Sequence, residues 1–214
     1  MTQLSELEQD ALKELFNIGM GRAAASLGRM VGGEILLSVP FLDILQPARA
    51  AQIIQKPGCD TVSAIRQSFN GPFNGTALLI FPEVNSLELV RTLVGEDLPL
   101  EHLGELEQES LLEVGNIVLN ACLGSFANLM RGEILFELPL FIKGSCLSLL
   151  RADSAVCDTT QAQPLLFLVV DFRTTEEARL AHRIQGYVLL LLDCTSTRNL
   201  RSQLQQLINE TLEP

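Results

Sequence analysis

The fold of this chain is decided by a stretch that occurs twice, as ELEQDALKELFNIGMGRAAASLGRMVGGEILLSVP at residues 6–40 and as ELEQESLLEVGNIVLNACLGSFANLMRGEILFELP at residues 105–139. At an offset of 99 residues and without a gap, the two copies agree at 14 of 35 positions. Self-similarity at a fixed offset indicates an internal duplication. The positions that both copies keep can therefore be compared as two versions of one structural unit.

Each copy combines a helical pattern with a strand pattern. Apolar residues recur at helical spacing over residues 6–31 and 105–131, and glycines then end both helices before an extended apolar stretch. Two more strands are predicted behind each copy, at residues 61–69, 76–81, 165–172 and 184–193. A short amphipathic helix is predicted after each strand pair, and the candidate N-caps are Asn85, Ser86, Thr195, Ser196 and Thr197. Residues 46–60 and 146–163 are interpreted as loops.

These elements predict an α/β (α+β) fold with pseudo-two-fold symmetry. Two long repeat helices should pack on one face of a mainly antiparallel sheet, because their apolar stripes need that cover. We expect residues 1–214 to form a single domain of two structural repeats, at about 6–100 and 105–212.

Composition narrows the class of protein. Hydrophobic residues make up 47% of the chain and charged residues 19%, which is typical of globular proteins. The net charge of −11 and the scattered basic residues argue against a nucleic-acid partner. No signal sequence is visible, and the longest apolar runs are far shorter than the roughly 20 residues of a membrane helix. We therefore expect a cytoplasmic protein without membrane insertion.

The cysteines and histidines do not suggest a metal centre or a disulfide framework. Five cysteines occur without any C-x-x-C spacing, beside only two histidines, His102 and His182. Buried free thiols are the better interpretation of this set. We place His102 on the surface before a helix and His182 in a loop that enters a strand.

One face of each repeat helix carries polar residues that the fold does not require. In the first copy they fall within an arc of about 60° and span about 10 Å of the helix, opposite the apolar stripe. The residues of the two faces are Asp10, Glu14 and Asn17, and Glu109, Glu113 and Asn116. The next turns of the first helix bring Gly21, Ala24 and Ala25, which should leave a flat surface that a macromolecule could approach closely.

A Glu-x-x-Asn sequence on an exposed helix is by itself an ordinary solvated face. Asparagine, however, costs a helix some tenths of a kcal/mol relative to alanine. Both copies keep it while nearby positions change, from Phe16 to Gly115 and from Gly19 to Val118. This pattern favours a function that needs the amide.

The pattern Asp10-x3-Glu14-x2-Asn17-x22-Pro40, echoed by Glu109-x3-Glu113-x2-Asn116-x22-Pro139, closely resembles the signature of the CheC/CheX/FliY family of chemotaxis phosphatases. Having two copies of the motif, the chain is most similar to CheC. The strings NIGMG and GNI strengthen the resemblance, which spans both repeats and is compatible with the strands behind them.

The resemblance implies that each repeat hydrolyses the aspartyl phosphate of a response-regulator receiver domain of the CheY type. Glu14 and Glu113 would pair with a receiver lysine, while the amide carbonyls of Asn17 and Asn116 would orient the attacking water. We expect further partner contacts from three residues, Asp10, Glu109 and Gly21. No cofactor of its own is implied, because Mg²⁺ would be supplied by the receiver. A receptor-modifying deamidase of the CheD type is a possible second partner.

The second copy departs from the family pattern. Glu109 is longer than the Asp10 that it replaces, and Leu112 and Leu123 are expected on the flank of the second polar face. We therefore favour the first site as the stronger one.

The sequence is also compatible, to different degrees, with functions other than phosphatase activity. The principal rival is a non-catalytic module of the same fold that docks a receiver, a deamidase or a flagellar-switch component. The G-x-G-x-x-A at residues 19–24 lies inside a helix with no strand before it, so it does not indicate a dinucleotide site. A sensor that binds a small ligand between the two halves lacks a convergent polar cluster.

Overall fold

The computed structural model describes residues 4–55, 60–94, 100–129, 132–153, 163–174 and 183–212. The elements in chain order are α1 (Glu6–Val31), β1 (Ile35–Leu45), α2 (Pro47–Ile54), β2 (Thr61–Asn70), β3 (Gly75–Pro82), α3 (Glu83–Val94), α4 (Leu100–Leu129), β4 (Leu135–Phe136), β5 (Leu140–Ser145), α5 (Cys146–Asp153), β6 (Leu165–Thr174), β7 (Ile184–Leu192) and α6 (Cys194–Leu212).

One antiparallel sheet contains strands from both halves of the chain. Six of its seven strands follow the order β1-β6-β7-β3-β2-β4, and the seventh, β5, also pairs with β2. Strands that follow the long helix of one half therefore pair with a strand of the other half, β1 with β6, and β4 and β5 with β2. The centre is the pairing of β3 with β7. The predicted mixed α/β fold with a mainly antiparallel sheet is confirmed.

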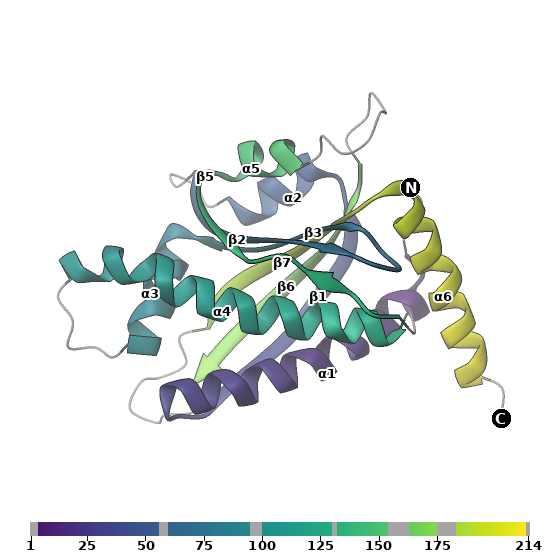
Figure 1. Ribbon diagram of the computed structural model, residues 1–214, viewed down its shortest axis with the longest axis horizontal. Coiled ribbons are helices and arrows are strands. Elements are labelled where there is room, and N and C mark those ends of the chain that lie inside the picture. Colours follow the sequence, from purple (N-terminus) through teal and green to yellow (C-terminus); the bar gives the residue numbers. More distant parts are fainter. Residues whose placement is uncertain are drawn as a thin grey trace.

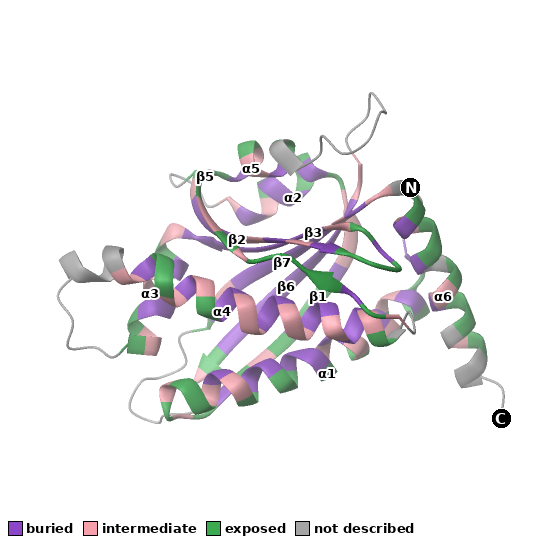
Figure 2. Cartoon of the chain, viewed as in Figure 1, coloured by how far each residue is buried: buried purple, intermediate pink, exposed green. Residues whose placement is uncertain are grey.

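The helices form a layer on each face of the sheet (Figure 1). The long helices α1 and α4 lie side by side on one face, as predicted, while the short helices α2 and α5 cover the other. Figure 2 shows the strands buried between the layers and the outward face of α1 exposed. The rings of Phe16 and Phe126 stack across the α1–α4 contact with their centroids 6.3 Å apart.

Gly19 allows α1 and α4 to approach closely. A Cβ atom on Gly19 would lie 2.6 Å from Ser125 Oγ and 2.7 Å from the Ala121 carbonyl oxygen on α4.

Among the described residues one helical segment, Leu106–Asn128 of α4, is long and apolar enough to span a membrane. Half of its most apolar stretch is buried inside the protein.

The short helices α2 and α5 correct the interpretation of residues 46–60 and 146–163 as loops. Ala50, Ala51 and Ile54 of α2 are buried against the second face of the sheet, together with Leu150 of α5. These helices have eight residues each, too few for a clear helical period in the sequence.

Two helix starts also differ from the prediction. Helix α4 begins at Leu100 rather than 105, so His102 lies within the helix and not before it. Helix α3 begins at Glu83, so Asn85 and Ser86 are internal. The Asn85 side chain donates to the Gln185 carbonyl oxygen at 2.7 Å instead of capping the helix.

The cap of α6 is Asp193, not one of the hydroxyl residues Thr195, Ser196 and Thr197. Its carboxylate accepts the Ser196 N–H at 2.6 Å. Although burial alone would raise the pKa of Asp193, the hydrogen bonds from Ser196 and its neighbours outweigh it and lower that pKa. His182, Cys59 and Cys157 lie outside the described residues.

Candidate functional site

The first polar face lies on the outer side of α1. Asp10 and Glu14 are exposed and Asn17 is half-buried, while Leu12 and Phe16 on the other side of the helix are fully buried. Lys13 lies 3.7 Å from Asp10, an exposed pair of small energetic value. The structure therefore places the three predicted residues together at the surface.

The amide oxygen of Asn17 is held by the strand that follows the helix. Oδ1 accepts the backbone N–H of Val39 at 2.9 Å. This N–H is available because the pairing of β1 with β6 changes register between Ser38 and Phe41. Pro40 lies in the same irregular stretch and has no N–H to contribute to a ladder. The 22 residues that separate Asn17 from Pro40 thus bring the donor Val39 to the amide.

This hydrogen bond fixes which way the amide points. Because Val39 N–H can only donate, the atom facing it must be the oxygen, and Nδ2 of Asn17 points away from it. The oxygen keeps a second lone pair. Asn17 can therefore both donate to and accept from a bound partner without reorienting its side chain.

The second polar face repeats the exposure pattern but not this contact. Glu109 and Glu113 are exposed and Asn116 is half-buried. The amide oxygen of Asn116 accepts from Asn120 Nδ2, one helical turn away, at 2.8 Å. Sequence reasoning missed Asn120, although a second asparagine on the same face of the helix was visible.

The second face opens into an apolar groove of about 800 Å³ between α1, α3, α4 and the break after β4. Glu109, Glu113 and Asn116 lie on one side of it. The apolar lining includes Met30, Leu93, Val94, Leu106, Leu112, Leu138 and Pro139. Leu138 is 86% exposed, which is unusual for a large apolar side chain.

Leu112 and Leu123, both expected beside the second polar face, have different positions. Leu112 is half-buried and lines the groove. Leu123 is fully buried in the core, so its placement on the flank of the face was wrong.

The first copy has its depression further along α1, with a volume of about 660 Å³. Gly21 and Ala25 are exposed there and Ala24 is largely buried. A Cβ atom on Gly21 would meet nothing within 4 Å, so its surroundings are open. The small residues beyond Asn17 thus line a shallow depression rather than the flat surface that the sequence predicts.

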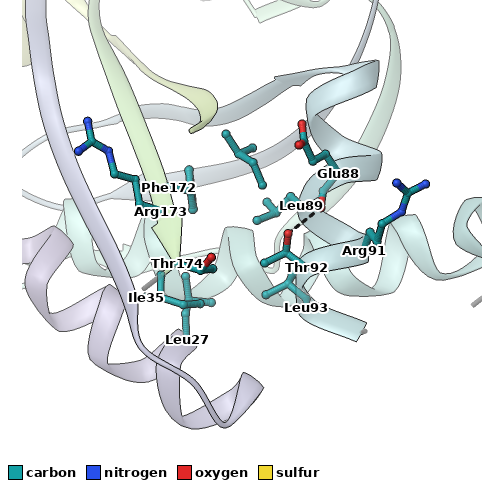
Figure 3. A pocket seen from close by; sticks show the side chains of 11 residues that line it. Leu27, Ile35, Glu88, Leu89, Arg91, Thr92, Leu93, Phe172, Arg173 and Thr174 are labelled. Atoms are coloured by element: carbon teal, nitrogen blue, oxygen red, sulfur yellow. Dashed lines mark hydrogen bonds between the residues drawn. The ribbon is translucent and has the colours of Figure 1, made fainter. Parts of the chain in front are cut away.

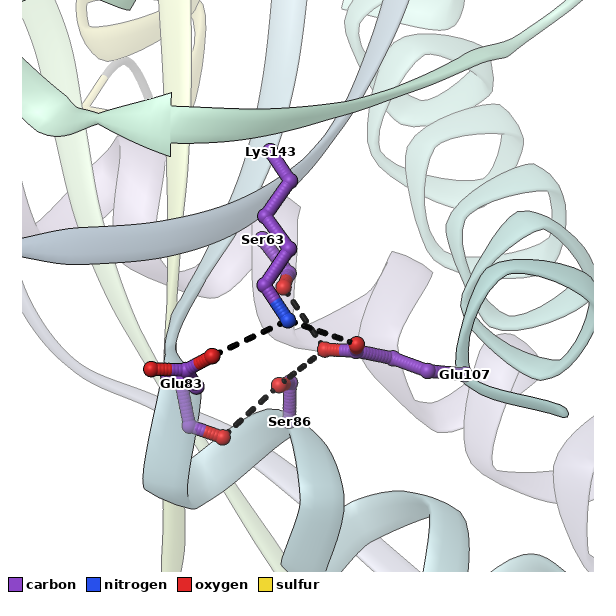
Figure 4. A network of polar contacts seen from close by, with 5 residues as sticks. All are labelled: Ser63, Glu83, Ser86, Glu107 and Lys143. Atoms are coloured by element: carbon purple, nitrogen blue, oxygen red, sulfur yellow. Dashed lines mark hydrogen bonds and ion pairs between the residues drawn. The ribbon is translucent and has the colours of Figure 1, made fainter. Parts of the chain in front are cut away.

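A buried polar network anchors α4 to the sheet (Figure 4). Glu107, only 3% exposed, accepts from Ser86 Oγ at 2.6 Å, Ser63 Oγ at 2.7 Å and Lys143 Nζ at 3.0 Å. Lys143 also pairs with Glu83 at 3.0 Å. Although burial alone would raise the pKa of Glu107, these three donors outweigh it and lower that pKa. Glu107 is thus a structural carboxylate held by three donors.

A small pocket lies between α3, β6 and the start of β1 (Figure 3). Its volume is about 150 Å³, below the roughly 300 Å³ of ordinary ligand sites. The charged ends of Arg91 and Arg173 point away from it. This pocket gives no support to a small-ligand sensor.

Metal-binding and thiol chemistry find little support in the described part of the chain. No group of three or more His, Cys, Asp or Glu side chains lies together there. Cys122 and Cys146 are free, buried thiols, and burial raises the pKa of each to about 12. Such thiols are inert at neutral pH.

No family model matches the chain. It is 28% identical over 140 residues to the CheY-P phosphatase CheC of Bacillus subtilis, a match that covers 64% of this chain and 66% of CheC. It is 22% identical over 133 residues to the flagellar motor switch phosphatase FliY of the same organism, covering 61% of this chain and 34% of FliY. The match thus spans just under two thirds of CheC and about a third of FliY.

Solved structures share the fold, among them the following two. Thermotoga maritima FliY superposes with a TM-score of 0.71 at 15% identity, covering 95% of this chain and 98% of that one. The FliM middle domain of Vibrio alginolyticus superposes with a TM-score of 0.60 at 13% identity, covering 90% and 99%.

Proposed function

This chain is a member of the CheC/CheX/FliY family, and on that premise we propose that it hydrolyses the aspartyl phosphate of a CheY-like response regulator in chemotaxis. One observation carries the proposal. Each of two exposed helical faces presents a glutamate and, one turn later, an asparagine whose amide oxygen is held by a fixed donor.

The asparagines act by positioning rather than by proton transfer. The remaining lone pair of Oδ1 accepts a hydrogen from the attacking water, and Nδ2 donates to a phosphoryl oxygen. Water attacks phosphorus as the bond to the aspartyl oxygen breaks, which yields inorganic phosphate and the free carboxylate. The receiver domain would supply the Mg²⁺ that offsets the negative charge of the phosphoryl group.

The glutamates act in docking. Glu14 and Glu113 are exposed and would pair with a lysine of the receiver, which fixes the register of the asparagine against the phosphoryl group. Asp10, Glu109 and Gly21 contribute further contacts. The proposed partner is therefore a receiver domain that is basic around its phosphorylation site.

A non-catalytic docking module of the same fold is the alternative. Two observations favour it: the fold is shared with the FliM middle domain, and the bond to Val39 gives Asn17 a structural role that needs no catalysis. A phosphatase accelerates the release of phosphate from the receiver, whereas a docking module only binds the receiver.

Phosphate release measures that turnover directly. A receiver phosphorylated with a small phosphodonor is freed of the donor, and release is followed in Mg²⁺ with and without the protein. The proposal expects release to accelerate at substoichiometric protein. Stoichiometric binding of the receiver without acceleration would establish the docking module instead.

A further inference from the structure

The two copies hold their asparagine amides with different donors. In the first copy the donor is the backbone of Val39, and in the second it is the side chain of Asn120. We propose that Asn120 and Gln67 are positioning residues that orient Asn116 for the reaction at the second site. This inference rests on the proposed phosphatase function and assigns two further residues to it.

The hydrogen bonds form a chain with a defined direction. Gln67 Nε2 donates to the backbone carbonyl of Glu137 at 3.1 Å and to Asn120 Oδ1 at 3.2 Å. Because a carbonyl can only accept, the nitrogen of Gln67 must face it. Asn120 therefore turns its oxygen toward Gln67 and its nitrogen toward Asn116. As a result Asn116 Oδ1 faces the chain, and its Nδ2 is directed away from it.

The first copy lacks both residues of this chain. At the offset of 99 residues, Gly21 corresponds to Asn120. Phe41 of the first copy pairs with Val169, and its counterpart Leu140 pairs with Arg66. The residue that follows Val169 is Val170 and the residue that follows Arg66 is Gln67, so Val170 is the counterpart of Gln67. The two positions are thus both polar in the second copy and both non-polar in the first. Such a joint difference is expected if the two side chains act together.

The strand that follows each long helix explains why the second copy needs Asn120 and Gln67. In the first copy β1 runs on through Pro40, and Val39 N–H reaches the helix. In the second copy the strand is interrupted, because β4 ends at Phe136 and β5 begins at Leu140. Gln67 instead spans from that interruption, at Glu137, to the helix.

Burial shows that Gln67 does not serve stability alone. Gln67 is 2% exposed, and its Oε1 has no hydrogen-bond partner among the described residues. An unpaired buried amide oxygen is destabilising, and an apolar side chain such as the valine at position 170 would avoid that cost. The polar side chain is therefore explained by what it orients, Asn120 and through it Asn116.

The test isolates the second site in an Asn17→Ala background. There Asn120→Ala should lower kcat about tenfold, as expected for one orienting hydrogen bond, while KM for the phosphorylated receiver stays within about twofold. Gln67→Val should lower kcat in the same direction and leave the melting temperature unchanged or higher. The matched control is Asn120→Ala in an Asn116→Ala background, where first-site turnover should not change.

A readout independent of turnover is the side-chain amide signal of Asn116 in ¹⁵N-resolved NMR of the free protein. Asn120→Ala should shift it, because Oδ1 loses its donor. Three outcomes overturn the inference: an unchanged kcat in the Asn17→Ala background, an equal loss in the Asn116→Ala control, or an unmoved Asn116 signal. If the unmutated protein shows no turnover, the proposed function itself fails, and this assignment fails with it.

Discussion

The side-chain oxygen of Asn17 accepts the backbone N–H of Val39 at 2.9 Å, which ties α1 to β1 where β1 leaves its ladder with β6. This bond gives Asn17 both a structural and a chemical role. A variant that removes the whole amide changes both roles together, so a second variant is needed to separate them.

Asn17→Asp and Asn17→Ala make that separation. A carboxylate still accepts the Val39 N–H but brings a negative charge to the phosphoryl group and loses the NH₂ donor, so Asn17→Asp should keep its stability and lose first-site turnover by on the order of 10²-fold. Asn17→Ala should lose the turnover and about 1 kcal/mol of stability. Urea unfolding and dephosphorylation kinetics in an Asn116→Ala background measure the two effects. Full activity of Asn17→Asp would contradict the proposed role of the amide.

Glu14 and Glu113 should act through binding. With the other site silenced, Glu14→Gln or Glu113→Gln should raise KM for the phosphorylated receiver roughly 5-fold and change kcat little, because the carboxylate pairs with a cation and transfers no proton. The KM of the unmutated protein should rise with salt. If Glu14→Gln instead lowers kcat and alters its pH profile, the carboxylate is a general base.

Gly19 and Gly21 form a matched pair on one helix. Gly19→Ala should destabilise the protein by about 1–3 kcal/mol, because its Cβ would lie 2.6 Å from Ser125 Oγ. Gly21→Ala meets open space and should stabilise the helix by up to about 1 kcal/mol. If a receiver approaches closely at Gly21, Gly21→Ala should also raise KM. Thermal unfolding and kinetics test both variants, and an equal effect on stability would contradict the packing described here.

Glu107 should make stability depend on pH on the acid side. Its pKa is lowered in the folded protein, so its contribution is fully present above the unfolded-state value of about 4.3 and is lost as pH falls through the folded-state value. Glu107→Gln should cost about 2 kcal/mol at pH 7, since it leaves Lys143 without one of its two carboxylates.

The difference in stability between Glu107→Gln and the unmutated protein should shrink below about pH 4. Exposed Glu113→Gln is the control and should change stability little. A difference between Glu107→Gln and the unmutated protein that does not depend on pH would contradict this account.

Much of the fold could be predicted because it is signalled locally. The apolar period of α1 stops at Gly32, whose φ of 68° suits glycine, so both ends of this helix matched the prediction. The break between β4 and β5 surrounds Pro139, and a proline within a strand pattern could have indicated it. The eight-residue helices α2 and α5 are too short to show a helical period in the sequence. Their burial depends on the sheet on which they pack.

Only the part of the site that depends on local sequence could be predicted. The exposed faces of Glu14 and Asn17 follow from helical period alone. The bond between Asn116 and Asn120 lies within one helix, but the contact of Asn17 with Val39 and the network around Glu107 bring together residues from separate elements. Their contacts follow from the strand order, which no local pattern specifies.

The most direct test compares the unmutated protein with the Asn17→Ala/Asn116→Ala double variant. Phosphate release from a phosphorylated receiver in Mg²⁺ gives turnover, and binding of the same receiver carrying a non-hydrolysable phosphoryl mimic gives affinity. The account predicts that the double variant binds the receiver within about threefold of the unmutated protein and loses at least about 10²-fold in turnover. Equal turnover by the two proteins would contradict the claim that these asparagines carry the reaction.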